Sequence, residues 1–435
     1  MSEILPRLRY AHRHQAEFRC ESVDQLLPPE HPARTVWDFV VGLDIGPLLD
    51  EIEALPGRAG APAFDPRILL AVWLYATIAS VGSSRKLEEL CQNHFVFRWL
   101  CGDMAISYRT LSGFRTGRGE YLSQVLTDSL ATLMQAGVVE LNQVAQDGMR
   151  VRAAAGASSF RCGETIERCL EEAKAQVELL QQQVDEDAGA ADRRSQAAQR
   201  RAAAERVERM EAAKEELNKL RATNAARPPS GRVDEETLRV STTDPEARKM
   251  KMADGGFRPA FNVQFATEVA TGLIVGVAVT NAGTDANEMV PMVAQIVERL
   301  DEKPKEMLVD GGYSNLEAID EVQSGGTVVF VPIREEKKQL DAGKDPYAAK
   351  KNDTPQTAEW RARMGTPEAK EKYKLRASTA EWVNAQVRNR GMYQVRVRGI
   401  AKVLTVTLWQ VLAHNFGRIL IHGSACPGEG TRIGK

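Results

Sequence analysis

Two apolar runs in this sequence end in an aspartate followed at once by glycine, and this pattern constrains the fold more than any other. Asp147 stands in AQDGM after the run VVELNQVAQ, and Asp310 stands in LVDGG after an equally apolar run. Apolar runs of this length with loose alternation predict strands. Because neighbouring strands of one sheet can end side by side, the two carboxylates are expected to lie close together. The glycine after each allows a ligand to approach the backbone closely.

Asp-Gly is also a common turn pair, so each strand end is explained equally well by a tight turn. If the two carboxylates do meet, they repel each other unless a proton or a cation lies between them. Mg²⁺ binds carboxylate oxygens and retains water ligands. Two such ions, roughly 3.5–4 Å apart, can stabilise both the attacking and the leaving oxygen of a phosphodiester. Spacing alone leaves the turn and the metal site as equal alternatives.

A third acid, Glu381, lies near the start of the segment RASTAEWVNAQVRNRG. Asn384 and Arg388 follow it at three and seven residues, on the same helical face. Polar and basic residues surround this segment in the sequence: Tyr373, Arg376, Arg390, Arg396, Arg398 and Lys402. One alternative is a surface helix with ion pairs. The other is a metal-binding carboxylate flanked by arginines that hold phosphates.

The rest of the chain divides by its periodicity. Residues 64–137 read as helices, with Asp65 and Ser83 as N-caps. Residues 164–222 carry apolar positions spaced four and three apart, which predicts two seamed helices joined as an antiparallel hairpin. After the hairpin the pattern is α/β, with Asp285 and Glu288 as a capping box. The sequence further predicts a largely irregular segment at 335–372, a helix from Arg376, a C-terminal helix and a disordered tail after residue 421.

Composition excludes several classes of protein. Lys and Arg total 57 against 59 Asp and Glu, so the net charge of −2 excludes a global polycation but not a local basic patch. The six cysteines form no CxxC pair and no zinc-like cluster with histidine, which favours free thiols in a reducing cytoplasm. The N-terminus lacks the apolar core of a signal peptide, and no run of 18 apolar residues predicts a membrane span.

Several segments together resemble the bacterial insertion-sequence transposases of the DDE type, and among them the group named IS eleven-eighty-two. HPARTVWDFV and the helical stretch from DPRILLAV to FRWLCG resemble the N-terminal domain of that family. VAQDGMRVRAAAG and LVDGGYSN resemble the motifs of its first and second catalytic aspartates. YKLRASTAEWVNAQVRNRG resembles its signature of Tyr, Arg, Glu and a basic residue, although here four residues rather than three separate Arg376 from Glu381.

The resemblance implies a ribonuclease-H-like mixed sheet flanked by helices, in an α/β fold with a helical N-terminal domain and an inserted helical hairpin. The implied domains are a helical DNA-binding domain at 1–137, a first core strand region at 138–160, a coiled hairpin insertion at 161–228, the remaining catalytic core at 229–420 and a disordered tail at 421–435. It implies Asp147, Asp310 and Glu381 as catalytic ligands of two Mg²⁺ or Mn²⁺ ions. The implied DNA-binding residues are Tyr373, Arg376, Asn384, Arg388, Arg390, Arg396, Arg398, Lys402 and, in the helical domain, Arg115.

The expected activity is cleavage at transposon ends and transfer of the 3′-OH into target DNA, by a dimer acting on double-stranded terminal repeats in the bacterial cytoplasm at the nucleoid. Three alternatives remain open: a catalytically inactive, domesticated DNA-binding protein, a stand-alone metal-dependent nuclease, and a scaffold organised by the hairpin. Asp244, in STTDPEARKM, is interpreted as a turn or cap acid rather than a neighbour of the site. His414 is interpreted as a helix-packing residue.

Overall fold

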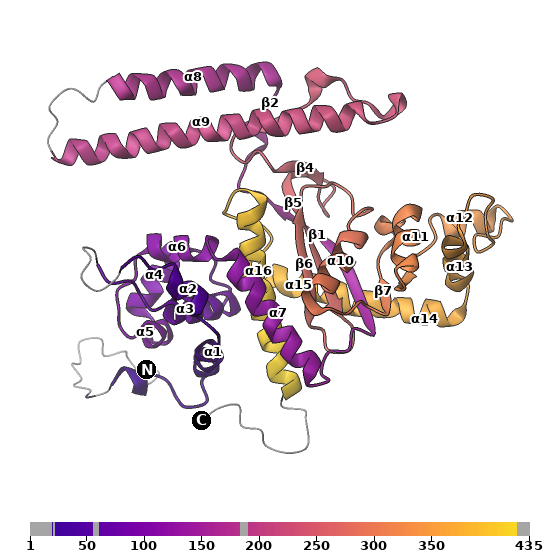
Figure 1. Cartoon of the computed structure of the whole chain (residues 1–435), viewed down its shortest axis with the longest axis horizontal. Helices are drawn as coiled ribbons and strands as arrows, with labels where there is room; N and C mark the ends of the chain where they lie inside the picture. Colours follow the sequence, from indigo (N-terminus) through magenta and orange to yellow (C-terminus); the bar gives the residue numbers. More distant parts are fainter. Residues whose placement is uncertain (1–19, 21, 55–60, 183–189, 424–435) are drawn as a thin grey trace, which may run out of the picture.

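The computed structural model describes residue 20 and residues 22–54, 61–182 and 190–423. Figure 1 shows three parts: a group of short helices near the N-terminus, a mixed sheet with helices against it, and a pair of long helices that projects from the sheet. Buried apolar side chains of the first two parts form one continuous core. The long helices have a small core of their own.

The first part consists of helices that begin at the caps read from the sequence. Asp65 accepts a hydrogen bond from the Arg67 backbone N–H, and Ser83 accepts one from Lys86. Trp73 is fully buried and donates its indole N–H to the Leu111 carbonyl at 2.8 Å. The helices are α1 (Pro32–Val41), α2 (Gly46–Asp50), α3 (Pro66–Ile78), α4 (Ser84–Asn93), α5 (Phe95–Cys101), α6 (Tyr108–Thr116) and α7 (Gly119–Gln135).

The sheet combines antiparallel and parallel strands in the order β4-β5-β1-β7-β8, and β6 pairs with β5. The strands are β1 (Gln143–Arg152), β4 (Arg248–Lys251), β5 (Phe257–Glu268), β6 (Ile274–Thr280), β7 (Glu306–Leu308) and β8 (Val328–Phe330). β1 runs antiparallel to β5 and parallel to β7, and β7 runs parallel to β8. The α/β character expected from the sequence is thereby confirmed.

The parallel pairing of β1 with β7 brings the two Asp-Gly pairs together. Asp310 lies just beyond the end of β7, but β1 continues past Asp147 to Arg152 and pairs with β5 there, so the prediction that Asp147 ends a strand was wrong. Ala145 pairs with Leu308, and each aspartate lies two residues beyond its paired residue. Residues at equal distances beyond a pair of parallel partners lie side by side. The register therefore places Asp147 and Asp310 next to each other, as predicted.

One long helix, α16 (Ile400–Gly423), connects the sheet to the N-terminal helices. Asn415 makes two hydrogen bonds of 2.9 Å with the backbone of Ile274 in β6. On the other side, Trp409 donates to the Arg115 carbonyl at 3.0 Å. His414 is 2% exposed and contacts the Gly272 carbonyl, and burial lowers its pKa to about 4. This agrees with a packing role for His414.

The projecting pair consists of α8 (Gly163–Gln182) and α9 (Ala190–Ala225), which lie side by side (Figure 1). Ion pairs join Glu167 to Lys214 and Lys174 to Glu211, so residue numbers increase along α8 in the direction in which they decrease along α9. The two helices are therefore antiparallel, as the sequence predicts. The base of the pair rests on the short strands β2 (Phe160–Arg161) and β3 (Val240–Ser241).

On α9 the predicted seam residues Ala203, Met210 and Leu217 are buried, but on α8 the seam is buried only near that base. Ile166 and Ala173 are fully buried and Leu170 is nearly so, whereas Val177 and Leu180 further along are only half-buried. Val184, the last predicted seam residue, lies outside the described residues.

The segment after β8 is more helical than the sequence suggested. Before β8 lie α10 (Met289–Leu300) and α11 (Leu316–Ser324). After β8 come α12 (Glu336–Asp341), α13 (Pro355–Met364), α14 (Pro367–Arg376) and α15 (Trp382–Asn389). The prediction of a largely irregular 335–372 segment was wrong. Both α13 and α14 start at a Thr-Pro pair, with Thr354 and Thr366 as N-caps, a recognisable start signal. The tail beyond residue 423 lies outside the described residues, while residues 421–423 belong to α16.

Candidate active site

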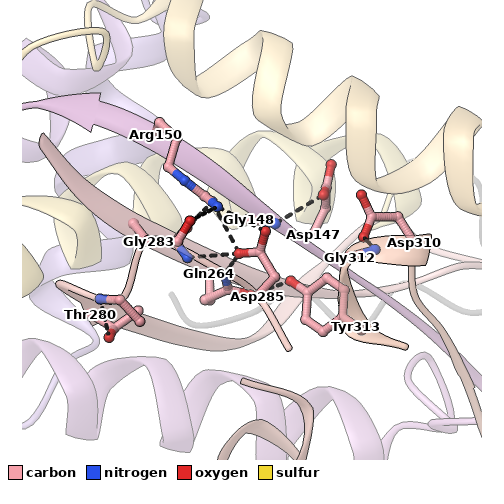
Figure 2. A network of polar contacts seen from close by, with 12 residues as sticks. Asp147, Gly148, Arg150, Gln264, Thr280, Gly283, Asp285, Asp310, Gly312 and Tyr313 are labelled. Atoms are coloured by element: carbon pink, nitrogen blue, oxygen red, sulfur yellow. Dashed lines mark hydrogen bonds and ion pairs between the residues drawn. The ribbon is translucent and has the colours of Figure 1, made fainter. Parts of the chain in front are cut away.

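Asp147 and Asp310 form the centre of the candidate site, where the central strand β1 lies beside the end of β7 (Figure 2). Asp147 Oδ1 accepts the Gly148 backbone N–H at 2.9 Å, and its Oδ2 accepts the Asn384 side-chain amide at 3.0 Å. Asp310 Oδ1 accepts the Gly312 backbone N–H at 2.7 Å and caps the short helical turn Gly311–Tyr313. Both carboxylates are therefore held in fixed orientations by neighbouring N–H groups.

The electrostatic environment of Asp147 opposes its ionisation. The pKa of Asp147 is raised to about 6. Burial is the largest cause, the charges of Asp310 and Asp285 act in the same direction, and Arg376 and the Gly148 N–H act against it. Three acids close enough to influence one another are unusual away from functional sites. A cation placed between them would relieve the repulsion.

This pKa gives a prediction for the metal-free protein. An unfolded aspartate has a pKa of about 3.9, so the folded state binds this proton more tightly. The stability that Asp147 contributes is therefore complete below about pH 4 and is lost as the pH rises through about 6. Asp147→Asn should be more stable than the wild type by about 1–3 kcal/mol at pH 7, and the gain should shrink towards pH 4. Urea unfolding in EDTA at both pH values measures it.

Asp301→Asn is the matched control, because Asp301 lies at the C-terminus of α10 in a left-handed conformation that asparagine also adopts. Its stability difference at each pH shows the effect of replacing an aspartate outside the site. A gain for Asp147→Asn that stays constant over this range, or reverses, would contradict the environment described for Asp147.

Glu381 is connected to the two aspartates through an arginine. The Arg376 guanidinium donates to Glu381 Oε1 at 3.0 Å and lies 3.6 Å from Asp147 Oδ2. Glu381 ends a π-helical turn, Ala377–Glu381, between α14 and α15, and its side chain is 58% exposed. The structure thus brings Glu381 near Asp147, but with a cation of the protein between them. Among the described residues, no three Asp, Glu, His or Cys side chains are close enough to hold a metal ion together.

Asp285 belongs to the same site, although the sequence predicted it to cap a helix. That prediction was wrong: α10 begins at Met289, and Glu288 precedes it without a side-chain cap. Instead, both Asp285 oxygens accept hydrogen bonds of 3.0 Å from Arg150 in β1. Figure 2 shows this pair beside Asp147.

Two amides of β5 complete the Asp285 cluster. Asn262 and Gln264 each donate to Asp285 Oδ1 at 2.7 Å, and both are fully buried. Tyr313, also fully buried, donates to Gln264, and burial raises the pKa of Tyr313 above its usual range. A sequence signal for this cluster did exist, because FNVQF places two amides at alternate positions of an otherwise apolar strand.

Gly148 makes this cluster possible. A Cβ at position 148 would lie 2.4 Å from Asp285 Oδ1, 2.5 Å from Gln264 Nε2 and 2.9 Å from Asn262 Oδ1. No real Cβ tolerates such contacts, so the Gly148 position must remain without a side chain. The glycine after Asp147 therefore admits the polar network of the protein itself, in addition to any ligand.

The remaining predicted residues do not all gather at the carboxylates. Tyr373 is half-buried with its ring 6.0 Å from the Arg376 guanidinium, and Asn384 contacts Asp147. Arg115, Arg390 and Arg396 line a separate cavity. The other three, Arg388, Arg398 and Lys402, are exposed. Asp244 is fully buried, and its Oδ1 accepts the Gly399 backbone N–H at 3.1 Å. This is the cap-like role expected for it.

The residues of this site fit a divalent cation between Asp147 and Asp310. Two carboxylates face each other, and Oδ2 of Asp310 receives no hydrogen bond from the residues that the structure describes. Carboxylate oxygens are the ligands that Mg²⁺ and Mn²⁺ prefer. Glu381 would become a third ligand only after Arg376 releases it.

Two segments of the chain match known protein families. Residues 21–117 match a family described as a transposase domain (DUF772), and residues 228–416 match a transposase DDE domain. No curated protein and no solved structure gives a match. No helix in the described part of the chain is long and apolar enough to cross a membrane. Together the two matched domains support an insertion-sequence transposase of the DDE type, an enzyme that acts on DNA.

Proposed function

We propose that this transposase cleaves DNA at transposon ends and joins the freed 3′-OH to target DNA, using Asp147, Asp310 and Glu381. The observation that carries the proposal is the pairing of β1 with β7, which sets two carboxylates side by side, one within β1 and one just beyond the end of β7. The strand order, with antiparallel pairing on the β5 side of β1 and parallel pairing on the β7 side, supports a ribonuclease-H-like core.

Asp147 and Asp310 would hold the divalent cations, two ions of Mg²⁺ or Mn²⁺, with Glu381 as the third ligand. When bound, the cations would lower the pKa of the attacking water or 3′-hydroxyl and stabilise the leaving oxygen. Asn384 and the Gly148 N–H fix both oxygens of Asp147. Arg376 balances part of the negative charge in the free protein and is placed to contact a phosphate when it leaves Glu381.

The finer points of the proposal follow from the same residues. The helices between α1 and α7 would recognise the terminal inverted repeats. Two copies of the chain would hold the two ends in the active complex, acting on double-stranded DNA in the bacterial cytoplasm. The group named IS eleven-eighty-two is the proposed place of this chain among its relatives.

The test is a strand-transfer assay with a duplex that carries the inverted repeat flanking the gene and is already cut to expose its 3′-OH. A joined product that requires Mg²⁺ or Mn²⁺ supports the proposal. Cleavage without joining would indicate a stand-alone nuclease. Binding with neither cleavage nor joining would indicate a catalytically inactive DNA-binding protein.

A further inference from the structure

A cavity of about 330 Å³ lies between the N-terminal helices and the catalytic part of the chain, away from the three acids. One wall comes from the turn between α3 and α4, residues 80–83, and from α6. The opposite wall comes from residues 390–397, which follow α15, and from α16. Both segments that match transposase families therefore contribute to it.

The cavity is lined by cations and by no acid. Lys86, Arg115, Arg390 and Arg396 all face it, and its lining contains neither Asp nor Glu. Lys86 has a partner outside, Glu89 at 2.8 Å. For the three arginines, the described residues supply no ion pair. The cavity also adjoins the N-terminus of α4, whose dipole adds positive potential.

Two of these arginines carry buried N–H groups without a hydrogen-bond partner among the described residues. Arg115 donates to the Gly82 carbonyl at 2.7 Å, and its guanidinium lies 4.8 Å from the centre of the Trp73 ring. Its Nε is nevertheless buried without a hydrogen-bond partner, and so is Nη1 of Arg390. Burial, with a contribution from Arg396, lowers the pKa of Arg115 to about 10. Buried donors without acceptors are costly, so an anion in the cavity would remove a standing penalty.

The position of the cavity relates it to the acids. The Val395 backbone N–H donates to the Arg152 carbonyl at 2.9 Å, and the Arg152 backbone N–H donates to the Tyr393 carbonyl at 3.1 Å. This segment therefore lies along the end of β1, five residues from Asp147, which corresponds to roughly 17 Å along a strand. A DNA backbone that enters at Asp147 can pass within reach of Arg390 and Arg396.

We propose that this cavity binds one backbone phosphate of the DNA whose end occupies the acidic site, with Arg115 from the helical part and Arg390 and Arg396 from the catalytic part. Arginine forks match the paired oxygens of a phosphodiester. Because both walls donate, the phosphate would hold the two parts of the chain together when DNA is bound. This inference rests on the proposed action on DNA ends.

The test uses the full chain and a duplex of about 30 base pairs, long enough for several phosphate contacts, with affinity measured by fluorescence anisotropy across a range of salt concentrations. The double variant Arg390→Met with Arg396→Met should bind at least about tenfold more weakly near 0.1 M salt. The salt dependence should also become shallower, by about 0.9 in log–log slope for one lost phosphate. Arg396→Met alone, at an exposed position, should show the same direction of change without a folding defect.

Lys338→Met is the control, because this exposed lysine lies in α12 and pairs with Glu335. It removes one positive charge, as Arg396→Met does, and should leave the slope unchanged. Duplexes with a neutral methylphosphonate at single positions locate the phosphate. At one position the methylphosphonate should weaken DNA binding by the wild type and leave DNA binding by the double variant unaffected. Inorganic phosphate at millimolar concentration should raise the melting temperature of the wild type more than that of the double variant.

Each result has a distinct meaning. In one outcome the double variant shows the same salt dependence of DNA affinity as the wild type, while the wild type binds and cleaves DNA. That result overturns the cavity as a phosphate site and leaves the proposed function standing. Stabilisation by inorganic phosphate without any change in DNA binding also overturns it, because the cavity would then hold a free anion only. A wild type that binds no DNA at any salt concentration overturns the proposed function itself.

Discussion

Asp310→Asn is expected to reduce metal-dependent cleavage of a DNA end by about 10³-fold or more. The substitution keeps the shape of the side chain and its capping bond to the Gly312 N–H, but it removes the negative charge that faces Asp147. Asp147→Asn should have the same effect. Single-turnover cleavage at saturating protein measures the loss, and affinity for the same duplex should stay within a few-fold of the wild type.

Asp301→Asn again serves as the control and should cleave like the wild type, because Asp301 lies at the end of α10. Cleavage by Asp310→Asn within about tenfold of the control would contradict the assignment. Glu381→Gln should also lose cleavage by about 10³-fold. For Glu381 the result is more informative, since its carboxylate now pairs with Arg376 and must exchange partners to join the site.

Gly148→Ala is expected to disturb both stability and cleavage. Its new Cβ would overlap Asp285 Oδ1 and the amides of Asn262 and Gln264. Overpacking of this kind costs about 1–3 kcal/mol in the free energy of unfolding. Because the displaced strand also carries Asp147, cleavage should fall by about 10²-fold, the usual cost of misplacing a reacting group by an ångström. Urea unfolding and single-turnover cleavage give the two quantities.

The comparison for this variant is Gly113→Ala in α6, where a new Cβ would have no heavy atom within 4 Å. Alanine inside a helix should stabilise the protein by roughly 0.5–1 kcal/mol and leave cleavage unchanged. If Gly148→Ala behaved like Gly113→Ala, the crowded network around Asp285 would not exist in solution.

The pairing of Asp147 with Asp310 could be predicted because it depends on local pattern and on one topological rule. Each aspartate follows an apolar run, and the two runs pair as neighbouring parallel strands, although β1 continues beyond Asp147. The hairpin was predictable for a similar reason, since its heptad spacing is a local property. The part of the site that rests on strand periodicity was therefore accessible to sequence reasoning.

The role of Asp285 could not be predicted in the same way. A local capping box explained Asp285 and Glu288 equally well, and the partner that overrides it, Arg150, lies 135 residues away. The bridge made by Arg376 between Glu381 and Asp147 also depends on how α14 packs against β1, which no local pattern reveals. Long-range polar contacts, rather than element boundaries, limited the prediction of the site.

The central claim, that Asp147 and Asp310 share divalent cations, is tested most directly by anomalous diffraction from crystals of the protein grown with Mn²⁺ and a DNA end. The account predicts an anomalous peak between the two carboxylates, with Arg376 turned away from Glu381. A well-occupied Mn²⁺ elsewhere, with Asp147 and Asp310 left without metal in a complex that cleaves its DNA, would contradict the account.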